Sequence, residues 1–332
     1  MPSSNPAPEP DGRRSIQLGY SLSTEEHRPE DLVGFARRAE EVGFAYASIS
    51  DHFHPWIDAQ GNSPFAWAVI GAIANATSTL RIGTGVTCPT FRYHPAVVAQ
   101  AAATAACLMP GRFFLGVGTG ENLNEHIVGR GWPPYEIRAA MLEEAVSVIR
   151  ELWTGENVDH RGEHFTIENA RLYTLPDEPP PIVVAAGGPN AAELAGRVGD
   201  GLINFAADPK IVETFDAAGR PGRPHYLQVN VCWNEDEAEA RRLAFKLCPT
   251  VALQGELGNL LPTPTHFEQT VQMLTEDAIA KVIVCGPDPE RHREVIQKGI
   301  DAGFDNIHVY QVGPDQEGFF RFYEREILPA FA

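Results

Sequence analysis

The segment SDHFHPW, residues 50–56, carries the densest group of reactive side chains in the sequence. A carboxylate, two imidazoles and an indole directly follow an apolar run, residues 44–50, that is typical of a buried strand. An Asp-His pair in a loop can also be a helix cap, and a nearby Trp can fill a core or an interface. In an alternating β/α chain, however, the carboxyl ends of the strands are where ligands and catalytic groups are held.

Three further loops follow predicted strands and are rich in glycine or small polar residues, namely residues 83–90, 116–121 and 185–189. In a barrel these loops would meet the SDHFHPW segment on one face. Glycine lets a backbone approach a flat or phosphorylated ligand closely. Gly187 and Gly188 precede a predicted helix, whose N-terminus could bind a phosphate, although an ordinary glycine turn is the alternative.

Glu121 stands immediately after the sequence GVGTG. This loop is not a dinucleotide fingerprint, because the spaced third glycine and an acidic partner for a ribose are missing. A carboxylate at Glu121 could act as an acid or a base opposite His52, one group taking a hydroxyl proton while hydride leaves the carbon. Alternatively, Glu121 is an ordinary residue of the first turn of a helix.

The elements that must position these residues alternate short apolar runs with longer segments of helical period. This pattern is typical of βα units around a parallel sheet, and eight such runs predict a closed (β/α)8 TIM barrel with insertion segments. We expect strands near residues 16–20, 44–50, 80–87, 113–117, 182–186, 201–205, 226–232 and 306–311.

Helices are clearest at residues 32–42, 96–108, 138–152 and 319–331, the first two opened by Pro29 and Pro95. Two stretches break the alternation. Residues 158–167 predict a small hairpin, and residues 249–266 form a loop too long for a plain βα turn. Long insertions in barrels commonly serve as lids or interfaces.

The composition limits the classes of function that the chain can have. The chain has 332 residues and a formal net charge of -18, so we expect no nucleic-acid partner, and its 43% hydrophobic content suits a globular enzyme with a small-molecule substrate. Five scattered cysteines without CxxC pairing predict reduced thiols in a cytoplasmic protein and no metal site. Residues 1–14 predict a disordered tail, and residues 15–332 a single barrel domain without a membrane segment.

Several ordered motifs resemble the family of F420-dependent glucose-6-phosphate dehydrogenases, within the bacterial luciferase-like superfamily. The resemblance runs from about Leu18 to Gly201 and more weakly to the C-terminus. The motifs that carry it are SDHFHPW, TGVTCPTFRYHPA, RFFLGVGTGENLNE, ELWTGENVDHRGEHF and IVVAAGGPNAAELAGRVGDG.

The resemblance implies a homodimeric barrel that binds the deazaflavin coenzyme F420 at its carboxyl face. It implies that His52 and Glu121 are the proton-transfer pair, that Trp56 stacks against or orients the substrate, and that Glu25 lies near the substrate. The resemblance leaves open which member of the pair is the base; we expect His52 to be the base and Glu121 to assist at the deazaflavin, because an imidazole titrates near neutral pH. It further implies cofactor contacts from Asp51, from a cis peptide bond between Gly85 and Val86, from Thr119 and Gly120, and from Gly187 and Gly188.

The implied reaction is oxidation of a sugar phosphate by hydride transfer to F420. Alternatives are an F420-dependent secondary alcohol dehydrogenase, a reductase of carbonyls or enones that uses reduced F420, an FMN-dependent monooxygenase, and a non-catalytic deazaflavin-binding protein. The basic residues that hold the sugar phosphate in this family fall near Asp208, Leu257 and Val282, none of which is basic. Candidate replacements from shifted loops are Lys210, Arg220, Arg223, His225, Lys246 and Lys281.

Overall fold

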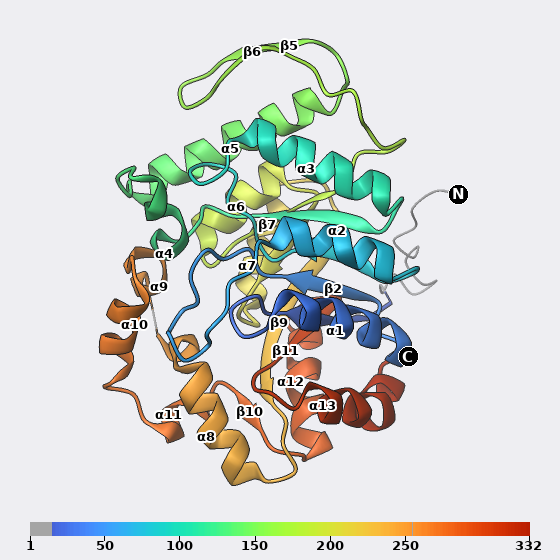
Figure 1. The fold of residues 1–332 in the computed structure, drawn as a ribbon, viewed down its shortest axis with the longest axis vertical. Coiled ribbons are helices and arrows are strands. Elements are labelled where there is room, and N and C mark those ends of the chain that lie inside the picture. The colour runs from blue at the N-terminus through green and yellow to red at the C-terminus, as the bar shows by residue number, and fades with distance from the viewer. Residues whose placement is uncertain (1–14, 254) are drawn as a thin grey trace.

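A computed structural model describes residues 15–253 and 255–332, so the predicted tail, residues 1–14, lies outside the described part. Eight parallel strands form a ring, which closes where β11 pairs with β1 and β8 pairs with β9 (Figure 1). They are β1 (Gln17–Leu22), β2 (Tyr46–Ile49), β3 (Arg81–Thr84), β4 (Phe113–Val117), β7 (Ile182–Ala185), β8 (Gly201–Asn204), β9 (His225–Cys232) and β11 (Asn306–Gln311). The predicted (β/α)8 barrel is confirmed, since each predicted run overlaps one barrel strand.

Aromatic rings fill the inside of the barrel. Tyr46, Phe114 and Tyr226 project from three different strands, and their ring centroids lie 5.1 to 6.2 Å apart. Glycines make room for these rings: a Cβ atom on Gly83 would come within 2.2 Å of the Phe114 ring, and one on Gly19 within 2.6 Å of the Tyr46 ring. The barrel interior is therefore a packed core and not a pore.

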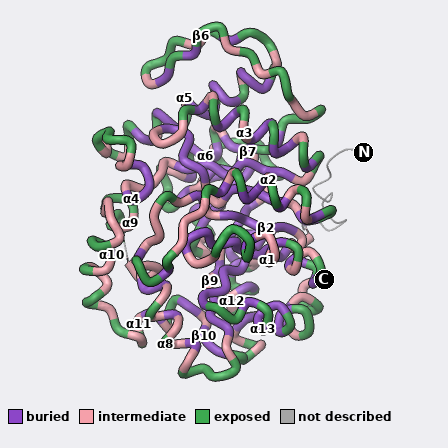
Figure 2. Tube along the Cα trace, viewed as in Figure 1, coloured by how far each residue is buried: buried purple, intermediate pink, exposed green. Residues whose placement is uncertain are grey.

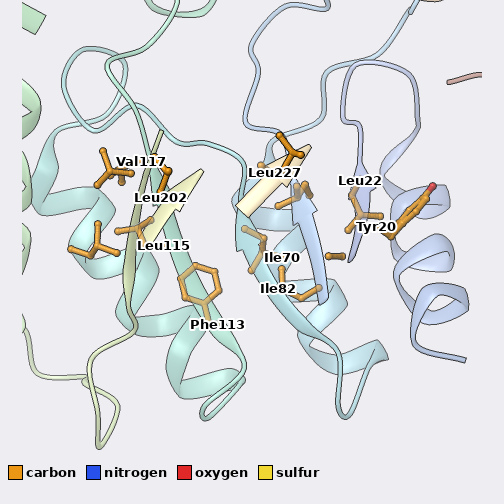
Figure 3. Close-up of a cluster of buried hydrophobic side chains, with 14 of the residues drawn as sticks. Tyr20, Leu22, Ile70, Ile82, Phe113, Leu115, Val117, Leu202 and Leu227 are labelled. Atoms are coloured by element: carbon orange, nitrogen blue, oxygen red, sulfur yellow. The ribbon is translucent and has the colours of Figure 1, made fainter. Parts of the chain in front are cut away.

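A second, larger core lies between the strands and the surrounding helices. Figure 3 shows Leu115, Val117 and Leu202 on the strands and Ile70 on a covering helix, and all four are buried. Figure 2 shows the same division, with buried segments at the centre and exposed ones on the outer helices. The covering helices are α1 (Pro29–Val42), α2 (Ala66–Ala76), α3 (Pro95–Leu108), α5 (Tyr135–Leu152), α6 (Pro189–Val198), α7 (Pro209–Ala217), α8 (Glu237–Leu247), α12 (Pro289–Asp301) and α13 (Gln316–Phe322).

The predicted hairpin is confirmed as β5 (Val158–Arg161) and β6 (Thr166–Ala170), an antiparallel pair that projects beyond α5 in Figure 1. The C-terminal helix differs from the prediction. Its α-helical part ends at Phe322, and a wider π-helical turn (Tyr323–Ile327) and a 3-10 turn (Leu328–Ala330) follow. The N–H of Leu328 bonds to the oxygen of Tyr323, five residues back, and Pro329 then has no N–H with which α-helical bonding could resume.

The long segment after α8 is more structured than the predicted loop. We call residues 249–283 the insertion; within its described residues lie a 3-10 turn (Pro249–Ala252), α9 (Leu257–Leu260), α10 (Pro264–Val271) and α11 (Glu276–Ile279). Of these, α9 stands beside α4 (Asn122–Glu125) at the left of Figure 1, with α10 below it, whereas α11 lies beside α8. The short strand β10 (Val284–Cys285) then returns the chain to the edge of β9. None of the described helices combines the length and the apolar character needed to cross a membrane.

At the other end of the barrel, Glu40 joins α1 to the start of β3. Its carboxylate accepts backbone N–H bonds from Ser78 at 2.9 Å, Thr79 at 2.5 Å and Leu80 at 2.8 Å. Burial alone would raise the pKa of Glu40, but these bonds lower it from 4.5 to about 2. Because the ionised carboxylate is the bonded form, the connection is strongest when Glu40 carries its charge.

We expect Glu40→Gln to reduce the free energy of unfolding by about 1 kcal/mol at pH 7. The pKa is depressed in the folded state, so this contribution is present above about pH 5 and is lost as the pH falls towards 2. Denaturant titrations at several pH values measure it. Glu41→Gln, on the neighbouring exposed position, is the control, and an equal loss in both variants at every pH would contradict this role.

Candidate active site

Three ionisable side chains meet at the carboxyl end of the barrel. Glu25 follows β1, His52 follows β2, and Glu121 follows β4 as the N-cap residue of α4. All three side chains are largely withdrawn from solvent, with exposed fractions of 7%, 11% and 30% respectively. The structure therefore brings together three residues that the sequence analysis assigned to proton transfer and substrate binding.

The imidazole of His52 has partners at both nitrogens. Nδ1 lies 3.1 Å from the backbone oxygen of His54, and Nδ1 carries the proton because a carbonyl only accepts. Nε2 lies 3.3 Å from Glu25 Oε1 and 3.4 Å from Glu121 Oε2. A lone pair on Nε2 facing two ionised carboxylates would be repelled, so the three groups hold a further proton among them.

The pKa values of the three groups are shifted in different directions. Burial lowers the pKa of His52, but the charges of Glu25 and Glu121 raise it above its ordinary value. Burial raises the pKa of Glu25, yet attraction to His52 and a bond from Ser50 bring it below the ordinary value. Burial and repulsion from Glu25 leave the pKa of Glu121 above the ordinary value, despite attraction to His52. Glu25 is thus the stable anion, and Glu121 is the carboxyl group that protonates more readily.

Two serine hydroxyls add to the attraction of His52 in lowering the pKa of Glu25. Ser50 Oγ donates to Glu25 Oε2 at 2.5 Å, and Ser23 Oγ donates to the same oxygen at 3.0 Å. Only the family resemblance predicts Glu25, and no role is predicted for the serines. The signals in the sequence are the hydroxyl and carboxylate residues directly after the first strand, and Ser50 directly after the second.

Trp56 forms the apolar wall of this site. Its ring centroid lies 5.1 Å from that of His52 and 5.1 Å from that of Phe267, which α10 supplies. Ile57 and Leu123 are buried in the same cluster. The insertion therefore packs against the residues beside His52, as expected of a segment that shapes a substrate site.

The carboxylate of Asp51 is fully buried and is engaged by protein donors. Thr87 Oγ1 donates to it at 2.6 Å, Tyr93 Oη at 3.0 Å and an Arg92 N–H at 3.1 Å. The predicted contact of Asp51 with a cofactor stays a prediction. Its observed role is to fix the loop that carries His52, through two residues that lie in the FRYHP part of a quoted motif.

Asn124 is a site residue that the sequence analysis missed. Its Nδ2 donates to Glu121 Oε2 at 3.1 Å, while its Oδ1 accepts the backbone N–H of Phe53 at 2.9 Å and of His54 at 3.3 Å. One amide thus connects the Glu121 carboxylate to the turn that holds His52. The signal was its position three residues after Glu121, one helical turn away on the same short helix.

The glycine loops surround this centre. The peptide bond between Gly85 and Val86 is cis, as the family resemblance implies. Val86 contacts the loop after β4, since a Cβ atom on Gly118 would lie 2.9 Å from its side chain. That loop also carries Thr119 and Gly120, and Gly120 adopts a φ of 80°, in the left-handed region that favours glycine.

Gly187 and Gly188 lie after β7 at the start of α6, and a Cβ atom on either would meet nothing within 4 Å. Pro189 opens this helix, and no side chain caps its N-terminus. The N–H groups of the first turn therefore face open space without a side-chain acceptor, a suitable arrangement for binding an anion.

Three of the suggested phosphate ligands lie at the wrong end of the barrel. Arg220, Arg223 and His225 precede or begin β9, at its amino end, away from His52. Arg223 donates to the backbone oxygens of Gly196, Gly199 and Phe215. Proximity to a strand in the sequence does not reveal which end of the strand a residue reaches, and this part of the prediction is wrong.

A cavity of about 1360 Å³ lies at the amino end, and its lining includes Arg112, Arg220 and the connection 175–181. It contains none of the residues around His52. The reactive groups, and not the size of a cavity, therefore locate the candidate active site.

Comparisons with known proteins agree with this geometry. The family model described as luciferase-like monooxygenase matches residues 15–306. A relative from Kribbella flavida is 39% identical over 95% of this chain and 98% of its own length, and one from Amycolatopsis mediterranei is 37% identical over the same shares. Both are named F420-dependent glucose-6-phosphate dehydrogenase.

A solved structure of an F420-dependent secondary alcohol dehydrogenase, in complex with an F420-acetone adduct, is also similar. It is 33% identical to this chain, has a TM-score of 0.87, and is matched over 96% of this chain and 99% of that chain. The chain therefore belongs to the luciferase-like monooxygenase family and, within it, to the family of the F420-dependent glucose-6-phosphate dehydrogenases.

Proposed function

We propose that the protein is an F420-dependent dehydrogenase that oxidises a CH–OH group, with a sugar phosphate as the leading substrate class. The observation that carries the proposal is the position of His52 Nε2 between two unequal carboxyl groups at the carboxyl end of the barrel. Mere binding of a deazaflavin does not need such a proton-transfer set. The relatives that match almost the whole chain support the cofactor and the reaction class.

The glycine loops suit F420. Gly187 and Gly188 and the open N-terminus of α6 would receive its phosphorylated arm, while Val86, Thr119 and Gly120 would contact its ring system. When bound, the deazaflavin supplies the carbon that accepts a hydride from the substrate. The remaining work, which is orientation and proton transfer, belongs to side chains of this chain.

In the proposed mechanism, neutral His52 takes the hydroxyl proton at Nε2, because Nδ1 is occupied by the bond to His54. Glu25 stabilises the imidazolium that results, and its bonds from Ser23 and Ser50 keep it ionised. Glu121, with its raised pKa, exchanges a proton on the cofactor side. Trp56 holds the substrate against His52 and excludes water from that side.

A secondary alcohol is the second candidate substrate. Asp208 caps α7 through a bond to the N–H of Lys210, and Leu257 and Val282 are exposed apolar residues. By the resemblance, the family's basic sugar-phosphate-binding residues fall near these three positions, and none of the three is basic. The similar solved structure named for secondary alcohols supports this alternative.

We expect oxidised F420, mixed with the protein and a substrate panel, to lose its deazaflavin absorbance. Loss with glucose 6-phosphate or another sugar phosphate supports the leading reading, and loss only with secondary alcohols supports the alternative. FMN in place of F420 tests for a monooxygenase, and reduced F420 with ketones and enones tests the reverse direction. Binding of F420 without turnover of any substrate in either direction would contradict the proposal.

The catalytic control in that assay is His52→Ala, which we expect to lower kcat/KM by about 100-fold or more, since it removes the general base. His160→Ala, on the exposed hairpin, should leave the rate unchanged. Turnover at the parent rate across the pH range in His52→Ala would remove His52 from the mechanism.

Glu25→Gln should shift the pH dependence of kcat/KM. The reaction needs neutral His52, so the rate rises with pH through the pKa of His52, which Glu25 raises. Removing the negative charge lowers that pKa, so the rising limb should move to lower pH by about one unit. Glu193→Gln on α6 is the control, and an unmoved limb in Glu25→Gln would contradict the electrostatic role.

We also propose that the protein is cytoplasmic. The five thiols are free, in keeping with a reducing compartment.

We further propose that the protein forms a homodimer through the outer faces of α2 and α3. An open groove of about 360 Å³ runs between the two helices. The residues that line it, among them Phe65, Val97 and Leu108, are all uncharged. Two copies with a formal charge of -18 each would repel, so an uncharged face favours their contact.

Val97→Asp places a charge in the centre of this face, where 54% of the side chain is exposed. We expect the mass in solution, measured by light scattering, to fall from two chains to one. Met273→Asp, at an exposed apolar position on the insertion, should leave the mass unchanged. A parent protein that is monomeric at micromolar concentration would rule out this interface.

A further inference from the structure

The surroundings of His52 contain an excess of negative groups. Glu25 approaches from the loop after β1, Glu121 from the N-cap of α4, and Asp51 from the adjoining position in the chain. Glu125 lies one turn after Glu121 on the same short helix. Several carboxylates this close together cannot all ionise in a buried site unless positive charge compensates them.

Arg92 supplies positive charge at this place. It lies on the loop between β3 and α3, and only 7% of its side chain is exposed. Its Nη2 donates to the backbone oxygen of Asp51 at 2.6 Å and to Oδ1 of the same residue at 3.1 Å. The guanidinium also covers the ring of Tyr93 at 4.4 Å from the centroid.

The same residue holds the segment that carries Glu121. The backbone N–H of Arg92 donates to Glu125 Oε2 at 2.8 Å, and Nε lies 3.7 Å from Glu125 Oε1. Arg92 thus joins the residue directly before His52 to the residue four positions after Glu121. The two members of the proton-transfer pair come from different strands, and this one side chain and its N–H connect both of their loops.

We propose that Arg92 is a positioning residue for the His52–Glu121 pair, fixing the spacing of the two loops and compensating the carboxylates around His52. This role rests on the proposed function for its catalytic meaning, but its electrostatic part exists without a cofactor. The competing explanation is that Arg92 only holds the two loops together. It predicts that Arg92→Gln lowers the stability of the protein without changing the pKa of His52.

The charge of Arg92 acts on both members of the pair. It lowers the pKa of His52, against the raising effects of Glu25 and Glu121, and it also lowers the pKa of Glu121. Burial raises the pKa of Glu125 to about 7 even beside Arg92. Removing the positive charge should therefore raise the pKa values of His52 and Glu121 together.

The experiment measures the pKa of His52 by NMR of histidine-labelled protein without cofactor, with His52→Asn to assign its signal. Arg92→Gln removes the charge, and Arg92→Lys keeps it while losing the paired geometry. We expect the pKa of His52 to rise by about half a unit or more in Arg92→Gln and to stay closer to the parent value in Arg92→Lys. Arg223→Gln, which removes a buried arginine at the opposite end of the barrel, should not move it.

Two outcomes overturn the proposal. An unchanged pKa of His52 in Arg92→Gln would leave only a structural brace, and equal shifts in Arg92→Gln and Arg92→Lys would show that charge is not the cause. If Arg92→Gln does not fold, because Asp51 loses its buried partner, the double variant Arg92→Gln/Asp51→Asn removes both charges of the pair. In it the pKa of His52 should be higher than in Arg92→Lys/Asp51→Asn, which keeps the positive charge, and equal values in the two double variants would overturn the electrostatic role.

The activity assay separates this role from the proposed reaction. If F420-dependent oxidation is observed, the rising limb of the pH profile should move to higher pH in Arg92→Gln and much less in Arg92→Lys. If the parent protein oxidises no substrate, the proposed function is wrong. The NMR titration still decides whether Arg92 has its electrostatic role, because it needs no cofactor.

Discussion

The structure of the site depends on one proton held between His52 Nε2 and two carboxyl groups. Because Nδ1 is committed to a backbone oxygen, only Nε2 can exchange this proton. Two identical carboxylates would compete for it equally, but Glu25 receives two serine hydroxyls and Glu121 does not. Attraction to His52 lowers the pKa of Glu25 and the serine bonds lower it further, whereas burial and repulsion from Glu25 keep the pKa of Glu121 raised. Glu25 is therefore the more stable anion, and Glu121 is the carboxyl group that protonates more readily.

The barrel makes that arrangement possible because its parallel strands end on one face, yet strand ends alone do not hold side chains to within a few tenths of an ångström. The loops after β2 and β4 come from strands separated by β3 and share no ladder of backbone bonds. Hydrogen bonds between side chains and backbone groups connect these two loops instead. Asn124 joins the two loops on one side of the pair, and Arg92 joins them on the other. Inside the barrel, the rings of Tyr46 and Phe114 pack against each other and keep the strands in place.

The sequence was sufficient to predict the barrel and to place His52 and Glu121 at its carboxyl end as candidates, and the physical reason is local in both cases. Buried parallel strands are continuous apolar runs, and His52 and Glu121 stand out because they directly follow such runs. The contacts that give these residues their properties are not local. Arg92 is 41 residues from Asp51, and Ser50 is 25 residues from Glu25. The insertion was predicted only as a loop, because helices of four to eight residues with Gly and Pro between them show no clear period.

The residues of the proposed reaction and the residues that would select the substrate come from different parts of the chain. His52 and both carboxyl groups come from barrel loops, whereas the wall beside Trp56 comes partly from Phe267 of the insertion. The insertion has four acidic residues and one lysine, so its net charge opposes a phosphate. With Arg220 and Arg223 at the amino end of the barrel, the suggested phosphate ligands that remain are Lys210, Lys246 and Lys281, besides a helix N-terminus. The proposed proton-transfer residues do not depend on these groups. This chain can therefore accept a substrate whose charge differs from that of its relatives' substrates, while the proposed proton-transfer residues stay the same.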